Sequence, residues 1–244
     1  MISRIMSLAL ILFLAVSSMF FYAGALVIWF ATFLYDRRLV ILHLYTSFWA
    51  SVYIWIFPAW SVKIEGRNKI DRKKTYIIVS NHQSQLDILV AFGLFTHFKW
   101  VSKSEIFRLP FIGWNMSLNQ YIKLKRGDRE SVNAMMAQCE RALRGGSPVY
   151  FFPEGTRSET GVLKPFKPGA FILAKKLKLP ILPVAITGTR EALPKHSLII
   201  RGRHDIRLRV LDEVPYEKFA GISVEETSLM IRKILAEAVH ETGA

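Results

Sequence analysis

The sequence predicts an α/β protein in which a mostly parallel mixed sheet is flanked by helices and preceded by a two-helix membrane-anchoring motif. After residue 62, short apolar stretches typical of strands alternate with stretches of helical periodicity, as in a parallel sheet with helical crossovers. Before residue 62 that alternation is replaced by two long uncharged stretches. We therefore expect an anchoring motif over residues 1–62 and a water-facing α/β domain over residues 63–244.

The uncharged stretches run from Ile5 to Tyr35 and from Leu39 to Val62, with Asp36, Arg37 and Arg38 between them. Each is longer than the roughly 18 to 20 apolar residues that span a bilayer, so two membrane helices are expected. A cleaved secretory signal is the alternative, but the apolar run continues past its small-residue site at positions 23–25. Because the first run is too long for an upright span, we expect the helices to lie within one leaflet rather than to cross.

The water-facing domain carries alternating strand and helix signals. Strands are expected near 62–65, 75–80, 98–102, 120–124, 149–152, 181–186 and 206–210, and helices near 84–94, 129–144, 169–178 and 223–241. Gly145 and Gly146 end the second of these helices, and a capping box at Ser223 and Glu226 begins the last. Loops at the ends of the strands are expected to carry the functional groups.

The most informative stretch joins the strand at 76–79 to the helix near 84–94. His82 lies on the connecting turn, where an imidazole can accept a proton near neutral pH. Asp87 follows five residues later and can hold the imidazole only if His82 lies outside the helix. The alternative is structural, because Ser84 and Asp87 also form a capping box.

A second polar turn follows the strand near 149–152, in the sequence Phe-Pro-Glu-Gly-Thr-Arg-Ser over residues 152–158. Together with Asn81, His82 and Asp87, this turn resembles the third and first motifs of the glycerolipid acyltransferases, the lysophosphatidic acid (1-acylglycerol-3-phosphate) acyltransferase family. Weaker matches to the second and fourth motifs occur at residues 121–127 and 182–185. Lysines just before Arg126 depart from the usual pattern, which leaves open whether Lys125 or Arg126 makes the expected contact.

The resemblance implies an enzyme that moves an acyl chain from a thioester of acyl carrier protein or coenzyme A to the sn-2 hydroxyl of 1-acylglycerol 3-phosphate. The product would be phosphatidic acid, a phospholipid precursor, and no cofactor beyond the thioester co-substrate is implied. A sister acyltransferase acting on glycerol 3-phosphate or another lysolipid is an alternative. A non-catalytic protein that binds anionic lipid is another, although such a protein has no need of the base that His82 offers.

The resemblance also implies roles for particular side chains. His82 and Asp87 would be catalytic, and the substrate phosphate would be held by Lys103, Arg126 and Arg157. The supporting residues would be Glu154, Gly155 and Thr156. For Arg157 the alternative is an ion pair with Glu154 or Glu159, and for Lys103 and Arg126 it is a solvated surface position. Glu154 could position the glycerol or brace its loop.

The net charge of +14 indicates which kinds of partner the chain can bind. Only Arg4, Asp36, Arg37 and Arg38 are charged within the first 62 residues, so almost all of the excess lies in the water-facing domain. The basic residues are not interleaved with stacking aromatics, which favours a membrane of anionic lipids over nucleic acid. His, Cys, Asp and Glu show no metal-ligand spacing, and Cys139 is the single cysteine. We expect the domain on the reducing, cytoplasmic face of a cell membrane, such as the inner membrane.

Overall fold

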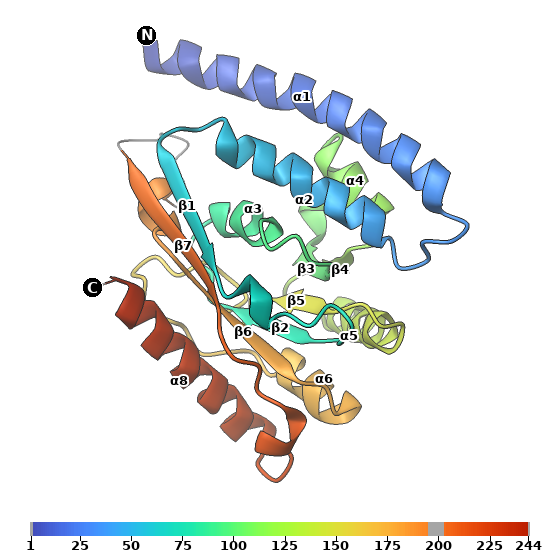
Figure 1. The fold of residues 1–244 in the computed structure, drawn as a ribbon, viewed down its shortest axis with the longest axis vertical. Coiled ribbons are helices and arrows are strands. Elements are labelled where there is room, and N and C mark those ends of the chain that lie inside the picture. The colour runs from blue at the N-terminus through green and yellow to red at the C-terminus, as the bar shows by residue number, and fades with distance from the viewer. Residues whose placement is uncertain (1, 195–202, 244) are drawn as a thin grey trace.

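The computed structural model describes residues 2–194 and 203–243, with side chains described from residue 12 to 194 and from 203 to 241. Its centre is a seven-stranded sheet in the order β1-β7-β6-β2-β5-β3-β4 (Figure 1). The strands are β1 (Trp60–Glu65), β2 (Ile77–Ser80), β3 (Lys99–Lys103), β4 (Ile122–Leu124), β5 (Val149–Phe151), β6 (Ile181–Thr187) and β7 (His204–Val210).

Five neighbouring strands, β6, β2, β5, β3 and β4, run parallel, and β7 is antiparallel to β6 and parallel to β1. The predicted mostly parallel mixed sheet is therefore confirmed. Because the five strands point the same way, the loops that follow them emerge along one edge of the sheet. We refer to it as the carboxyl edge.

The helices cover both faces of the sheet and form two cores. They are α1 (Ile2–Thr32), α2 (Val40–Trp55), α3 (Leu86–Phe92), α4 (Ile112–Leu118), α5 (Arg129–Arg144), α6 (Gly169–Leu177), α7 (Thr189–Ala192) and α8 (Val224–Gly243). Ile78 belongs to the core with residues of α2 and α3, whereas its neighbours Ile77 and Val79 belong to the core with residues of α5, α6 and α8. Figure 1 shows these two groups of helices on opposite faces of the sheet. Strands buried on both faces read as continuous apolar runs, which explains why the sequence signal was clear.

Helix α2 differs from the expected membrane helix. It ends at Trp55, and the uncharged run continues through a turn at Phe57 and Pro58 into strand β1, so the length of the run overestimates the helix. Its buried residues include His43. Ala50 and Ile54 belong to the core that α2 and α3 form with the sheet. Among the residues that the structure describes, one helix, over Leu12–Thr32 of α1, is long and apolar enough to cross a membrane.

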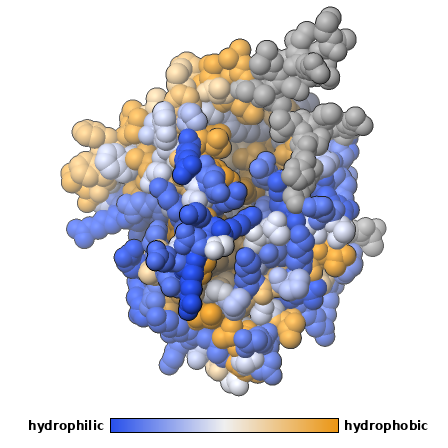
Figure 2. Space-filling view, turned by 180° about the vertical axis from the view of Figure 1, so that it is seen from behind, coloured by the Kyte–Doolittle hydropathy of each residue, from blue (hydrophilic) through white to orange (hydrophobic). Residues whose placement is uncertain are grey.

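Helix α1 lies along α2, on the outside of the molecule (Figure 1). Tyr53 of α2 hydrogen-bonds Ser17 and Ser18 at 3.0 Å each, and Phe21 stacks on Trp49 with ring centroids 5.4 Å apart. Helix α1 also exposes large apolar residues: Leu12, Phe13, Val16, Met19, Phe20, Leu26, Val27 and Phe30. Figure 2 shows apolar surface gathered along the top of the molecule, above a mostly hydrophilic body. This surface indicates that the protein associates with a membrane through α1.

Two isoleucines on α2 allow its structural role to be tested. Ile54 is buried in the core that α2 and α3 form with the sheet, whereas Ile41 is exposed on the same helix. We expect Ile54→Ala to lower the free energy of unfolding by about 2–5 kcal/mol, because truncating a buried side chain removes packing and leaves a cavity. Ile41→Ala should change it by less than about 1 kcal/mol. Denaturant unfolding in detergent measures both, and equal losses would contradict the packing of α2 as a core helix.

Candidate active site

The site begins where β2 passes into its turn at the carboxyl edge. Asn81 fixes the direction of the chain there, because its side-chain amide pairs with the backbone of Ile186 on β6. The Asn81 amide nitrogen donates to the Ile186 carbonyl and its oxygen accepts from the Ile186 N–H, both at 2.8 Å. The side chain thus continues the pairing of β2 with β6 by one step and directs the next residue, His82, away from the sheet.

The structure brings His82 and Asp87 together. The His82 Nδ1 lies 2.8 Å from the Asp87 Oδ2, which also accepts from the backbone N–H groups of Gln83 at 2.7 Å and Ser84 at 2.9 Å. Helix α3 begins at Leu86, so His82 lies outside the helix, as the spacing required. Asp87 is fully buried, and the His82 side chain is 12% exposed.

The capping alternative for Asp87 is also realised in part. Its carboxylate accepts the N–H of Ser84, and the Ser84 hydroxyl accepts the N–H of Leu86 at 3.2 Å. The same carboxylate oxygen therefore satisfies backbone donors at the start of α3 and holds the imidazole. The two interpretations of the sequence are compatible, because one fixed carboxylate serves both purposes.

Two neighbours of this pair were missed by the sequence analysis. The Thr189 hydroxyl donates to the Asp87 Oδ1, and the Phe152 ring stacks on the His82 ring with centroids 4.1 Å apart and planes 19° apart. Thr189 opens α7 just after β6 ends, and Phe152 directly follows β5. Their positions at the ends of parallel strands were the available signal, since such ends share one edge.

These contacts define which imidazole nitrogen is available. Asp87 has only acceptor oxygens when ionised, so His82 must donate through Nδ1. That leaves Nε2 as the nitrogen that can accept a proton. The carboxylate receives four hydrogen bonds in all, which offsets the cost of its burial and fixes the plane of the ring.

Glu154 braces the turns after β2 and β5 against each other. Its Oε1 accepts the backbone N–H of His82 at 2.8 Å, and its Oε2 accepts that of Lys164 at 3.0 Å. Ser158 adds a third link, because its N–H donates to the His82 carbonyl at 2.8 Å. Burial raises the pKa of the Glu154 carboxyl above its usual range. Of the two roles considered for Glu154, the geometry supports bracing.

Gly155 and Thr156 form the turn that follows. Gly155 has φ +68°, and its N–H donates to the Phe152 carbonyl at 3.0 Å. A Cβ on Gly155 would approach the Lys167 side chain to 2.8 Å, so glycine suits both the conformation and the space. Thr156 is half-buried in the same turn.

The three predicted cations all follow parallel strands of the sheet. Arg157 lies in the half-buried turn after β5, Lys103 ends β3 and is exposed, and Arg126 follows β4 and is exposed. Lys103 pairs in register with Leu124 at the end of β4, so the β3 and β4 ends are neighbours. Because β5 lies between β2 and β3, the cations and His82 follow consecutive strands along the carboxyl edge.

The alternative partners of these cations are partly resolved by the structure. Both carboxylate oxygens of Glu154 accept hydrogen bonds from backbone N–H groups rather than from Arg157. The Lys164 Nζ donates to the Arg157 carbonyl at 2.9 Å, which fixes the backbone of that turn. Lys103 forms an exposed ion pair with Glu105 at 3.1 Å, and Lys125 forms one with Asp128 at 3.3 Å. Exposed pairs of this kind are weak and can be exchanged for a ligand.

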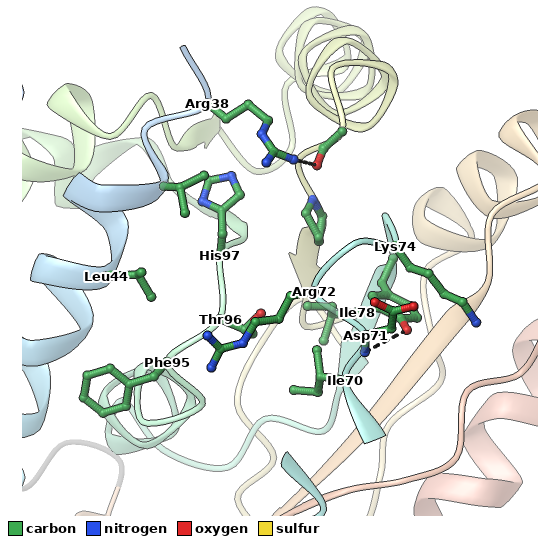
Figure 3. Close-up of a pocket in the computed structure, with 14 residues that line it drawn as sticks. Arg38, Leu44, Ile70, Asp71, Arg72, Lys74, Ile78, Phe95, Thr96 and His97 are labelled. Carbon is green, nitrogen blue, oxygen red and sulfur yellow. Dashed lines mark hydrogen bonds between the residues drawn. The ribbon is translucent and has the colours of Figure 1, made fainter. Parts of the chain in front are cut away.

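A cavity of about 90 Å³ lies at the opposite edge of the sheet, and its lining includes Arg38, Arg72 and His97 (Figure 3). Arg38 donates to the carbonyl of Gly146, just beyond α5, at 2.9 Å, and the Lys99 Nζ donates to the Arg38 carbonyl at 2.9 Å. Burial, together with Lys99 and Arg38, lowers the pKa of His97 to about 3. Cations at this edge satisfy carbonyls that follow the helices, a structural role.

Known proteins share sequence and fold with this chain. A fold in which a histidine–carboxylate pair and several cations lie along the carboxyl edge of a parallel sheet defines a class of α/β proteins suited to proton transfer on an anionic substrate. The family model for acyltransferases matches residues 61–187. The chain belongs to the acyltransferase family.

Several relatives are curated as 1-acyl-sn-glycerol-3-phosphate acyltransferases. A chloroplastic protein of Brassica napus is 36% identical over 85% of this chain, and one of Helicobacter pylori is 35% identical over 69% of it. The chain spans 59% of the Brassica protein and 71% of the Helicobacter protein. It spans less than two thirds of the first few relatives, including 46% of a chloroplastic protein of Arabidopsis thaliana that is 39% identical over 68% of this chain.

The fold also matches a solved structure. The crystal structure of the 1-acyl-sn-glycerophosphate (LPA) acyltransferase PlsC from Thermotoga maritima aligns with a TM-score of 0.74. The alignment covers 94% of this chain and 96% of that one at 24% sequence identity. The likeness therefore extends over the N-terminal helices as well as the sheet.

Thr189 offers a test of how the histidine–carboxylate pair is held. We expect Thr189→Val, which keeps the shape but lacks the hydroxyl, to lower kcat about 10- to 100-fold. A hydrogen bond to a charged group contributes about 1.5–3 kcal/mol, and Asp87 would lose one. Thr189→Ser keeps the donor and should retain most of the rate. A serine variant as slow as the valine variant, or a valine variant at full rate, would contradict this account.

Proposed function

We propose that the protein transfers an acyl chain from a thioester of acyl carrier protein or coenzyme A to the sn-2 hydroxyl of 1-acylglycerol 3-phosphate. The product is phosphatidic acid. The observation that carries the proposal is the 2.8 Å contact between His82 and Asp87 at the edge of the sheet where the cationic loops emerge. A base and an anion site side by side suit a substrate that bears both a hydroxyl and a phosphate. The relatives' curated activity supports the same substrate.

The proposed transfer uses both ring nitrogens of His82. The Nε2 of His82 takes the proton of the acceptor hydroxyl as its oxygen attacks the thioester carbonyl carbon. The ionised Asp87 stabilises the imidazolium through Nδ1. The tetrahedral intermediate then expels the thiolate, which recovers the proton from Nε2, so the ester forms and His82 returns to its neutral state.

No acyl-enzyme is required in this mechanism. Cys139, the single cysteine, is buried in the core on the α5 side of the sheet, where burial raises the pKa of its thiol to about 12. A thiol of that pKa is a poor nucleophile at neutral pH. Direct transfer from the thioester to the acceptor hydroxyl needs only His82 as the base.

The substrate phosphate is held by Arg157 with Lys103 and Arg126. Arg157 is half-buried beside the His82 turn, and its guanidinium can bind a phosphate through two parallel hydrogen bonds. Lys125 pairs with Asp128 as Lys103 pairs with Glu105, so Lys125 stays a candidate beside Arg126 for the contact that follows β4. Glu154, Gly155 and Thr156 shape the turn.

The enzyme works at a membrane surface, with the catalytic domain on the cytoplasmic face. Helix α1 packs lengthwise against α2 through Tyr53 and Trp49, so an upright α1 would carry the body of the domain into the hydrocarbon. An α1 that lies within one leaflet avoids this. The lysolipid then reaches His82 without leaving the bilayer, and anionic lipids meet a strongly basic domain.

The role of His82 is tested by replacement. We expect His82→Ala to reduce acyl transfer at least about 100-fold, the contribution of a general base. Asp87→Asn should be severely impaired as well, because an amide cannot stabilise the imidazolium. The His82 variant loses one of the four donors to Asp87 and should unfold at a lower temperature than the parent, but still in one cooperative transition. A well-folded His82→Ala protein that keeps more than about a tenth of the activity would rule out the mechanism.

Arg157 separates the anion site from the base. We expect Arg157→Ala to raise the KM for the phosphate-bearing acceptor much more than the KM for the acyl donor. Arg157→Lys should recover only part of the loss, because an ammonium group lacks the two-pronged geometry of guanidinium. Steady-state kinetics with each substrate varied in turn gives both constants. A raised donor KM with an unchanged acceptor KM would assign Arg157 to the thioester's phosphates.

The substrates themselves are tested directly with the purified protein in detergent. It is incubated with 1-acylglycerol 3-phosphate, glycerol 3-phosphate or a lysolipid without a phosphomonoester, each with either thioester donor. Mass spectrometry should find phosphatidic acid only with the first acceptor, and His82→Ala is the control for enzymatic origin. Acylation of glycerol 3-phosphate alone would indicate a sister enzyme. Lipid binding without product would indicate a non-catalytic protein.

A further inference from the structure

The segment between β3 and β4 exposes large apolar side chains outside the N-terminal helices. Leu109 is 50% exposed, Ile112 40% and Trp114 46%, with Phe111 half-buried among them. They lie where the short helix η2 (Ser104–Arg108) turns into α4. The residues Leu109–Trp114 are called the apolar turn below. The catalytic pair and the core account for none of these exposed side chains.

The apolar turn is held in a conformation that costs free energy. Phe111 has φ 59° and ψ −59°, and the N–H of Ile112 donates to the carbonyl of Pro110 at 2.6 Å. This is a γ-turn with positive φ, a rare and strained arrangement for a residue with a side chain. A Cβ on Gly113 would lie 2.5 Å from the backbone of Ile106 and Phe107, so α4 packs tightly against η2. The outward apolar side chains are thus part of a preformed structure.

Polar contacts on the inner side fix the orientation of α4. The buried amides of Asn115 and Asn119 each donate to the Thr46 hydroxyl of α2 at 3.1 Å. With that side anchored to α2, Ile112 and Trp114 are left facing outward. The apolar turn is therefore presented on a rigid element.

The apolar turn adjoins the exposed face of α1. The Tyr22 ring of α1 lies 6.2 Å from the Phe111 ring and 5.7 Å from the Trp114 ring. Figure 1 shows α4 directly beneath α1, on the same side of the sheet. Apolar surface that marks α1 for a membrane therefore continues onto a segment some 90 residues later in the chain.

The chemistry around the apolar turn matches a lipid interface. Tryptophan is enriched at the level of lipid head groups, with aliphatic residues deeper. Arg108 is exposed directly before the apolar turn, and the Lys123 Nζ lies 5.0 Å from the centroid of the Phe107 ring. Cations beside an apolar wedge suit anionic head groups, and the chain carries a net charge of +14.

We propose that the apolar turn is a second membrane-contacting element, which inserts beside α1 into the head-group boundary of an anionic bilayer. The position of the apolar turn in the chain links membrane insertion to the candidate phosphate site. Lys103 directly precedes η2, so the insertion holds one of the candidate phosphate-binding cations at head-group depth. The insertion itself does not depend on which reaction the site performs.

Depth-dependent quenching tests the insertion with a matched control. The single cysteine of the chain is buried, so Cys139→Ala gives a background in which one new cysteine can carry a fluorophore. Ile112→Cys reports on the apolar turn. Val132→Cys is the control, because Val132 is 39% exposed on α5, on the other face of the sheet. Both are labelled with NBD and bound to phosphatidylglycerol vesicles that contain shallow or deep spin-labelled lipids.

We expect a blue shift and strong quenching at position 112, and emission at position 132 like that in water. Equal, weak quenching at both positions would overturn the proposal. If lipids do not quench the label at position 112, but this position cross-links to a second copy of the chain, the surface would be assigned to self-association instead.

A second variant measures the contribution to binding without a label. Ile112→Ser with Trp114→Gln should lower partition onto phosphatidylglycerol vesicles about tenfold or more, as removal of apolar contact area predicts. Activity in detergent and thermal unfolding should match the parent, and Val132→Ser is the control. Unchanged partition of the double variant would contradict the insertion even if the labelled protein behaved as expected.

Discussion

The buried carboxylate of Asp87 is the group on which the rest of the site depends. An unpaired carboxylate in this position would cost several kcal/mol, yet it receives hydrogen bonds from the His82 ring, two backbone N–H groups and Thr189. Those donors come from the turn after β2 and from the start of α7. The hydrogen bonds to this one carboxylate, which lies on α3, therefore fix α3, the turn after β2 and the start of α7 relative to one another. They also set the tautomer of the imidazole.

The topology of the sheet places the other groups around that centre. Parallel pairing of β6, β2, β5 and β3 brings Thr189, His82, Phe152 and Lys103 to one edge, although they are far apart in the chain. Glu154 then locks the turns after β2 and β5 by accepting a backbone N–H from each side. Buried hydrogen bonds thus link these loops at the carboxyl edge, while Lys103 beside them is exposed and forms a weak ion pair with Glu105.

Local pattern was enough to predict much of this. Strands buried on both faces and capped helices have strong periodic signals, and the spacing of His82 and Asp87 allowed their contact. Thr189 and Phe152 were missed because their roles arise from strand order, which one sequence does not display. The length of helix α2 was overestimated because uncharged residues continue through Pro58 into β1. The apolar turn gave no periodic signal, since its geometry is a strained γ-turn at Phe111.

The proposed transfer requires that Asp87 hold His82 with Nδ1 protonated and Nε2 available as the base. The most direct measurement is nitrogen NMR of protein labelled with ¹⁵N-histidine in detergent, with the His82 signals assigned by their absence in His82→Gln. We predict that the neutral His82 ring has a protonated Nδ1 and an unprotonated Nε2, and that Asp87→Leu loses this preference. A neutral His82 that carries its proton on Nε2 in the parent protein would contradict it.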